Sequence, residues 1–486
     1  MNPKLLHHTI VHLRPKQVLY QLRYRLHKPK YKTFEAPYGV VTKLQTEPIP
    51  RYHCLDGEMF TFLNLEHKFS GWNFTDNGML WAYNQNYFDW LNQEGMTAEE
   101  GCRWIDRFIV ELPSNKVGID PYPIALRSIN WIKFLCGYPD CATRERLDSL
   151  YSQIKLLENK LEYHLLANHL LEDAYALYIA AHFFQDEKLQ KKASKLLLAQ
   201  LKEQTLPDGA HYEQSPMYHF ILLDRLLDCI NIAPTNELKF FAKRQLDWLK
   251  SICYQDGSFP LFNDSALGIA PVPNYIVDYA QRLGIESEAT PMKESGYRKL
   301  SNGTMEAIVD VGNITATYQP GHTHADTFNF EIRIDGKPFV VDTGISTYNK
   351  TERRQYERST VAHNTVSVAG KDSAEVWGGF RVGNRAKVKL IKDTSSEVLA
   401  LHNGFGRPCK RKFEITCDSF TVEDWFDGEA VSYVHLAEGV DENRVIVRDS
   451  LSVEVKPCKY SVEYNKFIIG KLLEIKFKNH LSYTIR

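Results

Sequence analysis

The fold is decided by the stretch FNFEIRIDGKPFVV (residues 328–341), which predicts two strands joined by a tight turn. Apolar residues occupy every second position from Phe328 to Ile334, the period of a strand with one buried face. Asp335-Gly336 follows at once, and this dipeptide is typical of two-residue hairpin turns. The stretch therefore predicts an antiparallel hairpin.

The two-residue period continues from this hairpin to the end of the chain. Near residue 300 the apolar period changes from about 3.6 to about 2, and short alternating runs replace longer ones. Further strand-like runs are 364–368, 386–391, 397–401, 412–416 and 444–455. Many short strands separated by turns favour an antiparallel β-sandwich over residues 296–486.

Helical periodicity covers residues 86–295 instead. The expected helices are 122–138, 145–184, 187–204, 216–230 and 236–254. Leu206-Pro-Asp-Gly209 and Tyr254-Gln-Asp-Gly257 are similar breaks that lie 48 residues apart. This is the spacing of stacked helical hairpins, so we expect a repeated α/α domain.

Residues 1–85 are rich in Pro, Tyr and Trp with weak periodicity, and we expect them to wrap the helical domain. Their first 34 residues contain no Asp or Glu. The basic residues there are Lys4, Arg14, Lys16, Arg23, Arg25, Lys28, Lys30 and Lys32. Apolar residues recur at near-helical spacing from Leu13 to Leu26, which suits an amphipathic helix on a membrane surface or an acidic polymer. A solvated helix packed on the domain edge is the commoner outcome.

Composition limits the class of protein. A chain of 486 residues is long enough for two large cores. Its formal net charge of -1 argues against the strongly positive electrostatic potential of a nucleic-acid-binding protein. No apolar run has the length of a membrane span, and polar residues from His7 to Arg14 interrupt the start where a secretion signal would be apolar. Nine cysteines without metal-type spacing suit reduced thiols. We expect a cytoplasmic protein, or a periplasmic one if a leader was removed.

The segment Gly321-His-Thr-His-Ala-Asp326 places two imidazoles and a carboxylate at alternate positions before a strand. His324, Asp342 and His363 lie at the ends of neighbouring strand-like runs and could form a three-ligand site for a divalent metal, best suited to zinc. Each histidine alone is more often a surface or satisfied core residue.

Two helical segments carry candidate polar groups. Asn168 lies inside the expected helix 145–184, on one face with His164 and Glu172, where structural hydrogen bonding competes with a role at a site. Ser215 and Pro216 form a good helix start, which places Tyr218 in the first turn. There the helix dipole favours phenolate, so Tyr218 is a candidate proton carrier, with core packing as the alternative.

A basic and aromatic run follows the hairpin: Tyr348, Arg353, Arg354, Tyr356 and Arg358. Its guanidinium groups could bind carboxylates or sulfates through two parallel hydrogen bonds, although surface decoration would look similar.

Three blocks in order, at residues 321–326, 341–348 and 358–365, make the chain resemble the heparinase II/III family of polysaccharide lyases, in a leaderless, alginate-lyase-like form. Asn168-His169 and the segment 208–219 resemble the catalytic helices of the same enzymes. The resemblance implies an incomplete (α/α) toroid followed by an antiparallel β-sandwich, with the active cleft between the two halves.

The family cleaves polymers that contain uronic acids by β-elimination. By similarity, Asn168 and His169 would hold the uronate carboxylate, Tyr218 would act as base, acid or both, and His322 would be a second proton-transfer or neutralising group. Substrate contacts are expected from Arg127, His211, Glu213, Tyr348, Arg353 and Arg358. His324, Asp342 and His363 match the structural metal ligands of some members. Leaderless chains with a basic N-terminus also resemble those of capsule or exopolysaccharide biosynthesis, so the substrate could be the producer's own anionic polymer.

Two other functions remain open. A non-catalytic polymer-binding or assembly component could keep the fold, but it would not need Asn168, Tyr218 and His322 to converge on one point. A glycoside hydrolase on the same toroid would need two facing carboxylates. Asp208 and Glu213 are the obvious candidates in the helical half, and they have no evident partner.

Overall fold

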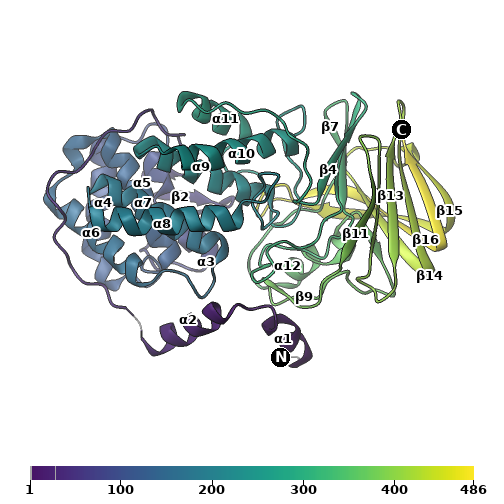
Figure 1. Cartoon of the computed structure of the whole chain (residues 1–486), viewed down its shortest axis with the longest axis horizontal. Helices are drawn as coiled ribbons and strands as arrows, with labels where there is room; N and C mark the ends of the chain where they lie inside the picture. The colour runs from purple at the N-terminus through teal and green to yellow at the C-terminus, as the bar shows by residue number, and fades with distance from the viewer. Residues whose placement is uncertain (1–2, 28) are drawn as a thin grey trace.

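The protein consists of a helical half followed by a sheet half, as Figure 1 shows. The computed structural model describes residues 3–27 and 29–486. The helical half runs from Met79 to Arg282, and the first strand of the sheet half begins at Tyr297. The expected fold class, an incomplete (α/α) toroid followed by an antiparallel β-sandwich, is therefore confirmed.

Helices in the first half alternate between an inner and an outer layer. Each inner helix contacts the next, and the inner helices are α3 (Met79–Tyr87), α5 (Pro121–Gly137), α7 (Ala167–Phe183), α9 (Pro216–Ile232) and α11 (Pro273–Arg282). The outer helices are α4 (Ala98–Glu111), α6 (Arg144–Asn159), α8 (Glu187–Gln204) and α10 (Asn236–Ile252). The contacts of α6, α8 and α10 with α5, α7 and α9 complete the toroid-like pairing.

Residue pattern explains which layer each helix occupies. In α7, 15 of 17 residues are buried, because the helix is apolar nearly all round. In α8 only 6 of 18 are buried, and Lys, Gln and Glu cover the outer face. The expected helix 187–204 is found with the same bounds.

The prediction of a single helix over residues 145–184 is wrong, because the helix is interrupted between α6 and α7. The carbonyl of Glu162 accepts hydrogen bonds from the amides of Leu165 and Leu166, and Asp173 accepts one from the Glu162 amide at 2.7 Å. Leu166 has a φ of 63°, so α7 begins only at Ala167. No glycine or proline lies between residues 160 and 166, and the sequence therefore gave no stop signal.

The two breaks with similar sequence form the same turn. At each break, the amide of the first residue, Leu206 or Tyr254, donates a hydrogen bond to the carbonyl four residues later. The amide of the glycine then donates to the carbonyl of that first residue. Gly209 and Gly257 have φ values of 96° and 81°, which other residues adopt only with strain. The helical repeat predicted from these turns is confirmed.

The pairs of named strands in the sheet half are antiparallel, and one isolated parallel bridge joins Gly344 to Ser461. Its main path is β11-β12-β13-β14-β7-β6-β5-β4, and β8, β15 and β16 join through β14 and its neighbour β16. The strands are β4 (Tyr297–Ser301), β5 (Met305–Asp310), β6 (Phe330–Ile334), β7 (Lys337–Val340), β8 (Val366–Ser367), β11 (Val388–Asp393), β12 (Glu397–His402), β13 (Cys409–Ile415), β14 (Phe420–Leu436), β15 (Val445–Tyr460) and β16 (Ile468–Ile485). Their inward faces enclose a separate apolar core that includes Phe330, Phe413 and Phe420.

The predicted hairpin is β6 and β7. Asp335 and Gly336 have φ values of 51° and 72°, and two positive values in succession are the mark of the turn that matches strand twist. The hairpin pairs with β5 on one side and β14 on the other.

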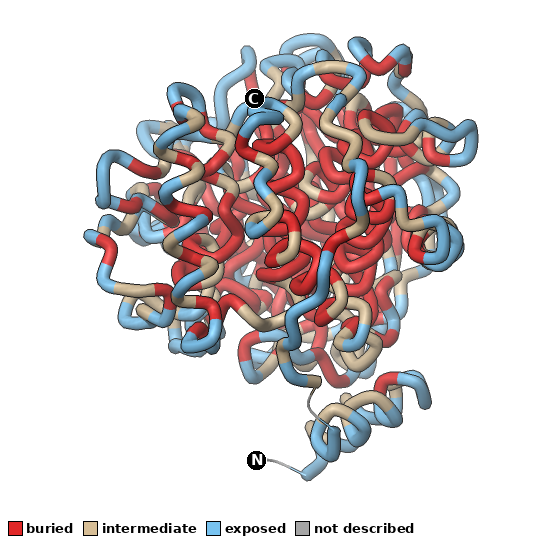
Figure 2. Tube along the Cα trace, turned by 90° about the vertical axis from the view of Figure 1, so that its left-hand side faces the viewer, coloured by how far each residue is buried: buried red, intermediate tan, exposed pale blue. Residues whose placement is uncertain are grey.

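The segment before α3 lies across both halves. Helices α1 (Pro3–Ile10) and α2 (Pro15–Leu26) are followed by extended chain, whose residue Val41 donates a hydrogen bond to the Phe183 carbonyl. A three-stranded sheet, β1 (Leu55–Asp56), β2 (Met59–Phe62) and β3 (Leu65–Lys68), precedes α3. Figure 2 shows the densely buried body and the N-terminal helices at its lower edge.

All nine cysteines are free. Among the described residues, no helix combines the length and apolar character needed to cross a membrane.

Candidate functional site

Tyr218 stands in the first turn of α9, as predicted. The Ser215 hydroxyl accepts a hydrogen bond from the Tyr218 amide at 3.3 Å, and Pro216 is the first helical residue. Ser215 also donates to the carbonyl of Asp264 at 2.7 Å, so the helix start is tied to a neighbouring loop. This fixes the direction in which the Tyr218 side chain leaves α9.

The Tyr218 ring lies against the imidazole of His322, with ring centroids 3.8 Å apart. Its hydroxyl is 3.3 Å from the Tyr348 hydroxyl. Burial raises the pKa of Tyr218 above its usual value, and the Tyr348 hydrogen bond and the charge of Arg354 offset only part of this effect. The expectation that the helix dipole favours phenolate is therefore wrong: desolvation dominates, and Tyr218 rests as the phenol.

Asn168 lies in the first turn of α7 and not in the middle of a long helix. Its amide and its side-chain nitrogen donate to Glu213 at 2.9 and 3.0 Å. The side-chain nitrogen also lies 3.3 Å from His322 Nε2. His164 precedes α7, so it does not share a helix face with Asn168. Glu213, which was expected to bind substrate, is buried and orients Asn168.

His169 follows on the same turn and is partly exposed. Its Nδ1 is 3.0 Å from Glu162 Oε2, and its ring packs edge-on to Tyr122. Burial by itself lowers the pKa of His169, but the charge and hydrogen bond of Glu162 outweigh it, and the pKa is raised. His169 is thus prepared to carry positive charge.

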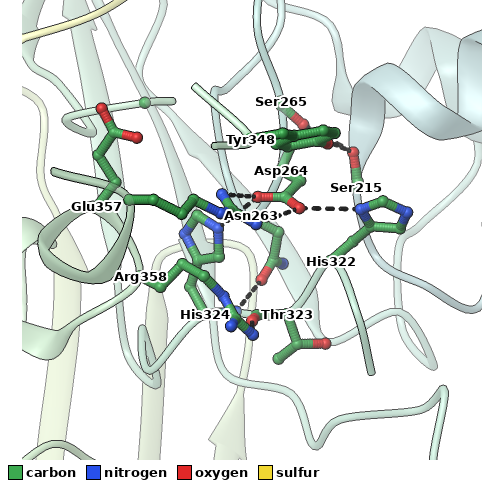
Figure 3. A network of polar contacts seen from close by, with 12 residues as sticks. Ser215, Asn263, Asp264, Ser265, His322, Thr323, His324, Tyr348, Glu357 and Arg358 are labelled. Carbon is green, nitrogen blue, oxygen red and sulfur yellow. Dashed lines mark hydrogen bonds and ion pairs between the residues drawn. The ribbon is translucent and has the colours of Figure 1, made fainter. Parts of the chain in front are cut away.

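Asp264, on the loop between α10 and α11, binds several side chains of the site. Its carboxylate forms hydrogen bonds with His322 Nδ1 at 2.9 Å and with His324 Nε2 at 2.8 Å. The guanidinium of Arg354 donates to both carboxylate oxygens at 2.5 and 2.8 Å. Figure 3 shows Asp264 beside His322, with Tyr348 close by. These contacts hold the pKa of Asp264 well below its usual value, against the effect of burial.

Sequence reasoning missed Asp264. The residue stands in an irregular loop, Asn263-Asp264-Ser265, that belongs to no periodic pattern. The neighbouring Asn263 accepts from the His324 amide at 3.0 Å and donates to the Gln214 carbonyl at 3.1 Å, so the loop joins both halves. A turn-like Asn-Asp-Ser cluster was the only signal, and such clusters are common in plain loops.

Backbone strain gathers around these residues. Leu166, Ala167, Gln214 and Asn263 have φ values of 63°, 55°, 59° and 57°. Ala167, Gln214 and Asn263 each stand next to a residue of the site, and Leu166 directly precedes Ala167. Non-glycine residues adopt this conformation only at an energetic cost. Strain held by the surrounding structure is typical of functional positions.

Exposure separates the reacting groups from their supports. Tyr218, Tyr348 and His169 keep partial exposure, and the His322 side chain keeps 10%. Asp264 and Glu213 are buried. Asn168 is buried as well. The partly exposed groups are therefore held by buried ones, as in a preorganised site.

Arg127 and His211 do not meet this site at the surface. Arg127 is fully buried, and its guanidinium donates to Gln153, Asn86 and Gly118 at 2.7 to 3.0 Å. His211 is also buried, and its Nε2 is 2.9 Å from Gln204. Both side chains hold helices together, and we no longer expect them to bind substrate.

Of the arginines at 353, 354 and 358, the one that contacts the site is not one of the two that were expected to bind substrate. Arg353 lies on the outside of α12 (Glu352–Glu357), where it binds Glu357 at 2.7 Å. Arg358 is buried and donates to the Thr323 carbonyl at 2.8 Å, so it shapes the loop that carries His322. Arg354 is the one that reaches the site, whereas Tyr348 lies beside Tyr218 as expected.

The predicted metal ligands are neighbours but do not form a cage. The rings of His324 and His363 are 5.3 Å apart, and His363 Nδ1 is 2.8 Å from Asp342 Oδ2. His324 Nδ1 and His363 Nε2 are buried without a hydrogen-bond partner, which suits metal binding. Across residues 3–27 and 29–486, however, no three His, Cys, Asp or Glu side chains are grouped closely enough to hold an ion. The zinc site stays a prediction.

The arrangement combines three chemical groups around one point. Asn168 supplies an amide donor, His322 an imidazole held by Asp264, and Tyr218 a protonated phenol. His169, whose pKa is raised by Glu162, lies next to Asn168 in the chain. Such a set can neutralise a carboxylate and move protons to and from a bound molecule.

Family comparison gives a consistent assignment for most of the chain. Residues 145–283 match the model described as heparinase II/III N-terminus, and residues 285–462 match the one described as heparinase II/III-like, C-terminal. A heparin-sulfate lyase of Bacteroides stercoris is 24% identical over 239 residues, which make up 42% of this chain and 36% of that protein. The chain thus matches well under half the length of such curated relatives.

Solved structures support the fold over a wider range. A crystal structure of heparinase III superposes with a TM-score of 0.66 at 15% identity, covering 85% of this chain and 79% of that one. A heparan sulfate lyase from Pedobacter heparinus gives a TM-score of 0.55 at 16% identity, covering 96% and 87%. The likeness of fold therefore extends over both halves.

Proposed function

Since the chain belongs to the heparinase II/III family, we propose that it is a polysaccharide lyase that cleaves a uronic-acid-containing polysaccharide by β-elimination. The matched relatives are named for heparin sulfate, an anionic polysaccharide, and we propose the same class of substrate for this chain.

One observation carries the proposal: Asn168, Tyr218 and His322 converge. His322 touches both of the others, with 3.3 Å to the Asn168 nitrogen and 3.8 Å between its ring and that of Tyr218. These residues come from α7, α9 and the loop before β6, so only the tertiary structure brings them together. A fold kept merely for polymer binding has no need of this convergence.

Elimination makes separate demands that these groups can meet. The proton on C5 of a uronate becomes acidic when the adjacent carboxylate is neutralised, which we assign to the Asn168 amide and to His169, whose pKa is raised by Glu162. A base removes that proton, the C5–H electrons form the C4–C5 double bond, and the C4–O4 bond breaks. O4 then takes a proton from an acid.

We assign the acid role to Tyr218 and the base role to His322. Tyr218 rests as the phenol, since burial raises its pKa, and it can therefore give a proton to O4. His322 Nδ1 is bonded to Asp264, so a proton held there leaves Nε2 free to accept. Asp264 then stabilises the imidazolium that forms, as a carboxylate behind a catalytic histidine commonly does.

The stacked rings also bear on the substrate's configuration. Because Tyr218 and His322 lie against each other, they approach a sugar from the same side. Removal of H5 and protonation of O4 on one face require these two substituents to be cis. D-Glucuronate and D-mannuronate have this configuration, whereas L-iduronate and L-guluronate do not.

A substrate panel tests the proposal. The protein is incubated with polymers of glucuronate, iduronate, mannuronate and guluronate, and ultraviolet absorbance of the unsaturated uronate is followed. Appearance of this absorbance with cis polymers supports the lyase. New reducing ends without absorbance would show hydrolysis, and polymer binding without either product would show a non-catalytic component.

Hydrolysis finds little support in the carboxylates of the helical half. Asp208 accepts hydrogen bonds from the Lys293 and Ser295 amides at 2.9 Å, so it stabilises a turn. Glu213 is occupied by Asn168. A role in handling the producer's own exopolysaccharide remains part of the proposal, with the source of the polymer to be set by the same panel.

A structural divalent metal, zinc by preference, is a further part of the proposal. His324 and His363 would supply the buried nitrogens that lack partners, and Asp342 would contribute through its contact with His363. Elimination uses no water nucleophile, so an ion here would hold the loops that carry His322 and would leave proton transfer to the side chains.

A further inference from the structure

The N-terminal helix α2 is inverted relative to ordinary surface helices. The side facing the body is polar and aromatic: Gln17 donates to the Leu165 and Tyr318 carbonyls, and Tyr24 donates to the Leu161 carbonyl at 2.5 Å. Tyr20 packs on Tyr163 with ring centroids 4.7 Å apart. A surface helix usually buries its aliphatic stripe and exposes its polar one. In α2 the aliphatic residues do not pack on the body of the protein, so they can contact a partner.

The outward side of α2 is aliphatic. Val18, Leu22 and Leu26 follow one another at four-residue steps, and they are 41%, 53% and 89% exposed. Leu19 beside them is 61% exposed. Ile10 and Val11, where α1 ends, are also exposed, at 48% and 59%. Single exposed leucines are normal, but a continuous stripe marks an interaction surface.

Cations surround this stripe. Arg23 and Arg25 alternate with Leu22 and Leu26 on α2 and are exposed. Residues 1–34 hold eight of the chain's 59 Lys and Arg residues and none of its 60 Asp and Glu residues, so the rest of the protein is acidic on balance. Lys28 belongs to this segment but lies outside the described residues. The N-terminal segment is therefore the part suited to an anionic partner.

The segment is anchored to both halves, so whatever it binds is held against the whole protein. In α1, His8 bonds Glu375 at 2.7 Å, and Thr9 accepts from Trp377 at 3.1 Å in the sheet half. In α2, Gln17 and Tyr24 bond the chain just before α7 in the helical half. Figures 1 and 2 show the two helices together at one edge of the body.

We propose that α1 and α2 form a docking surface for an anionic lipid membrane. Aliphatic side chains in a cationic rim match the boundary between acyl chains and acidic headgroups. There the aliphatic side chains are buried and the arginines bind the acidic headgroups. An anionic polysaccharide would satisfy the arginines but would offer nothing to Leu22 and Leu26. The two helices are too short and too polar to cross the bilayer, so they lie in its surface.

Vesicle cosedimentation of the full chain tests this proposal. The protein should sediment with phosphatidylglycerol-containing vesicles and not with phosphatidylcholine alone, and added salt should weaken binding. Leu22→Gln/Leu26→Gln changes no charge and should lower the affinity by about tenfold or more, because only the aliphatic contact is lost. Arg23→Gln/Arg25→Gln should reduce the preference for phosphatidylglycerol.

A matched control uses aliphatic residues that are equally exposed elsewhere. Leu451→Gln/Ile469→Gln removes side chains that are 61% and 51% exposed on the sheet half, and it should leave vesicle binding unchanged. Lyase turnover on soluble polymer should be the same in all three variants, so this test is independent of the proposed activity.

Three outcomes would overturn the proposal. The first is no binding to phosphatidylglycerol vesicles. The second is binding of soluble anionic polysaccharide that Arg23→Gln/Arg25→Gln abolishes and Leu22→Gln/Leu26→Gln spares, with no vesicle binding. The third is self-association, seen by analytical ultracentrifugation, that Leu22→Gln/Leu26→Gln removes, which would make the stripe an interface between copies.

Discussion

The imidazole of His322 is held between Tyr218 on one side and Asp264 on another: its ring centroid lies 3.8 Å from that of Tyr218, and its Nδ1 lies 2.9 Å from Asp264 Oδ2. The imidazole to which we assign proton removal is thus placed against a phenol and oriented by a buried carboxylate.

Tyr218→Phe is expected to abolish elimination while polymer binding persists. The ring still packs on His322, and only the proton-carrying hydroxyl is lost, so turnover should fall by about a hundredfold or more. Unsaturated product and polymer affinity are measured on the same samples. Tyr212→Phe is the matched control, because it removes a buried hydroxyl that bonds Tyr318 at 2.7 Å away from the reacting groups. Near wild-type turnover of Tyr218→Phe would remove this residue from the mechanism.

Asn168→Ala is expected to lower turnover by about a hundredfold or more, the scale seen when one preorganised donor to developing negative charge is removed. Turnover and thermal unfolding are measured together. Asn231→Ala removes a comparably buried amide that bonds Thr46 and Tyr279, so it should lower stability and leave turnover intact. If Asn168→Ala behaved like this control, Asn168 would be structural.

Asp264→Asn is expected to reduce turnover by about a hundredfold to ten-thousandfold, because an amide cannot hold the His322 tautomer or stabilise its charged form. It should also destabilise the protein by about 3 kcal/mol, since Arg354 stays buried without its counter-charge. Turnover is compared with urea unfolding.

The control for this variant is Asp424→Asn. Asp424 forms a similar buried pair with Arg411, at 2.6 and 2.7 Å, in the sheet half. Its loss should cost similar stability but little turnover. Equal losses of turnover in the two variants would show that the Asp264 effect comes from stability alone.

Glu172 is expected to make stability depend on pH. Burial raises the pKa of this carboxyl from 4.5 to about 7, and the charge of Arg225 only partly opposes the shift. The folded state therefore binds the proton more tightly than the unfolded state does, and stability falls as pH rises from about 4.5 to 7. Glu172→Gln should remove up to about 3 kcal/mol of this loss, which urea unfolding at several pH values will measure. An unchanged profile would contradict the buried-acid assignment.

Zinc analysis of the purified protein is expected to find one ion per chain. His363→Ala should lose it and should unfold at lower temperature, as should wild-type protein treated with a chelator. His402→Ala removes another buried histidine of the sheet half and should keep the metal while losing stability. Zinc retained by His363→Ala, or wild-type protein purified in zinc without bound metal, would exclude the site.

Several parts of the fold follow from local patterns of residues along the chain. The hairpin around Asp335-Gly336, the helix 187–204 and the Ser215 helix start all follow from period, turn residues and capping, which act over a few positions. The motif blocks were likewise enough to identify the family.

How these parts meet depends on the folding of the whole chain. Asp264 comes to His322 across 58 positions of sequence from a loop without periodicity. Arg353 and Arg354 are adjacent on a short helix, and consecutive residues point about 100° apart, so only one of them can reach the carboxylate. Burial, which no local pattern reports, raised the pKa of Tyr218 against the dipole of its own helix. The α2 pattern showed an apolar stripe, and only packing showed that this stripe faces outward. Contacts between distant segments set these outcomes, because charge, desolvation and packing depend on every group that surrounds a side chain.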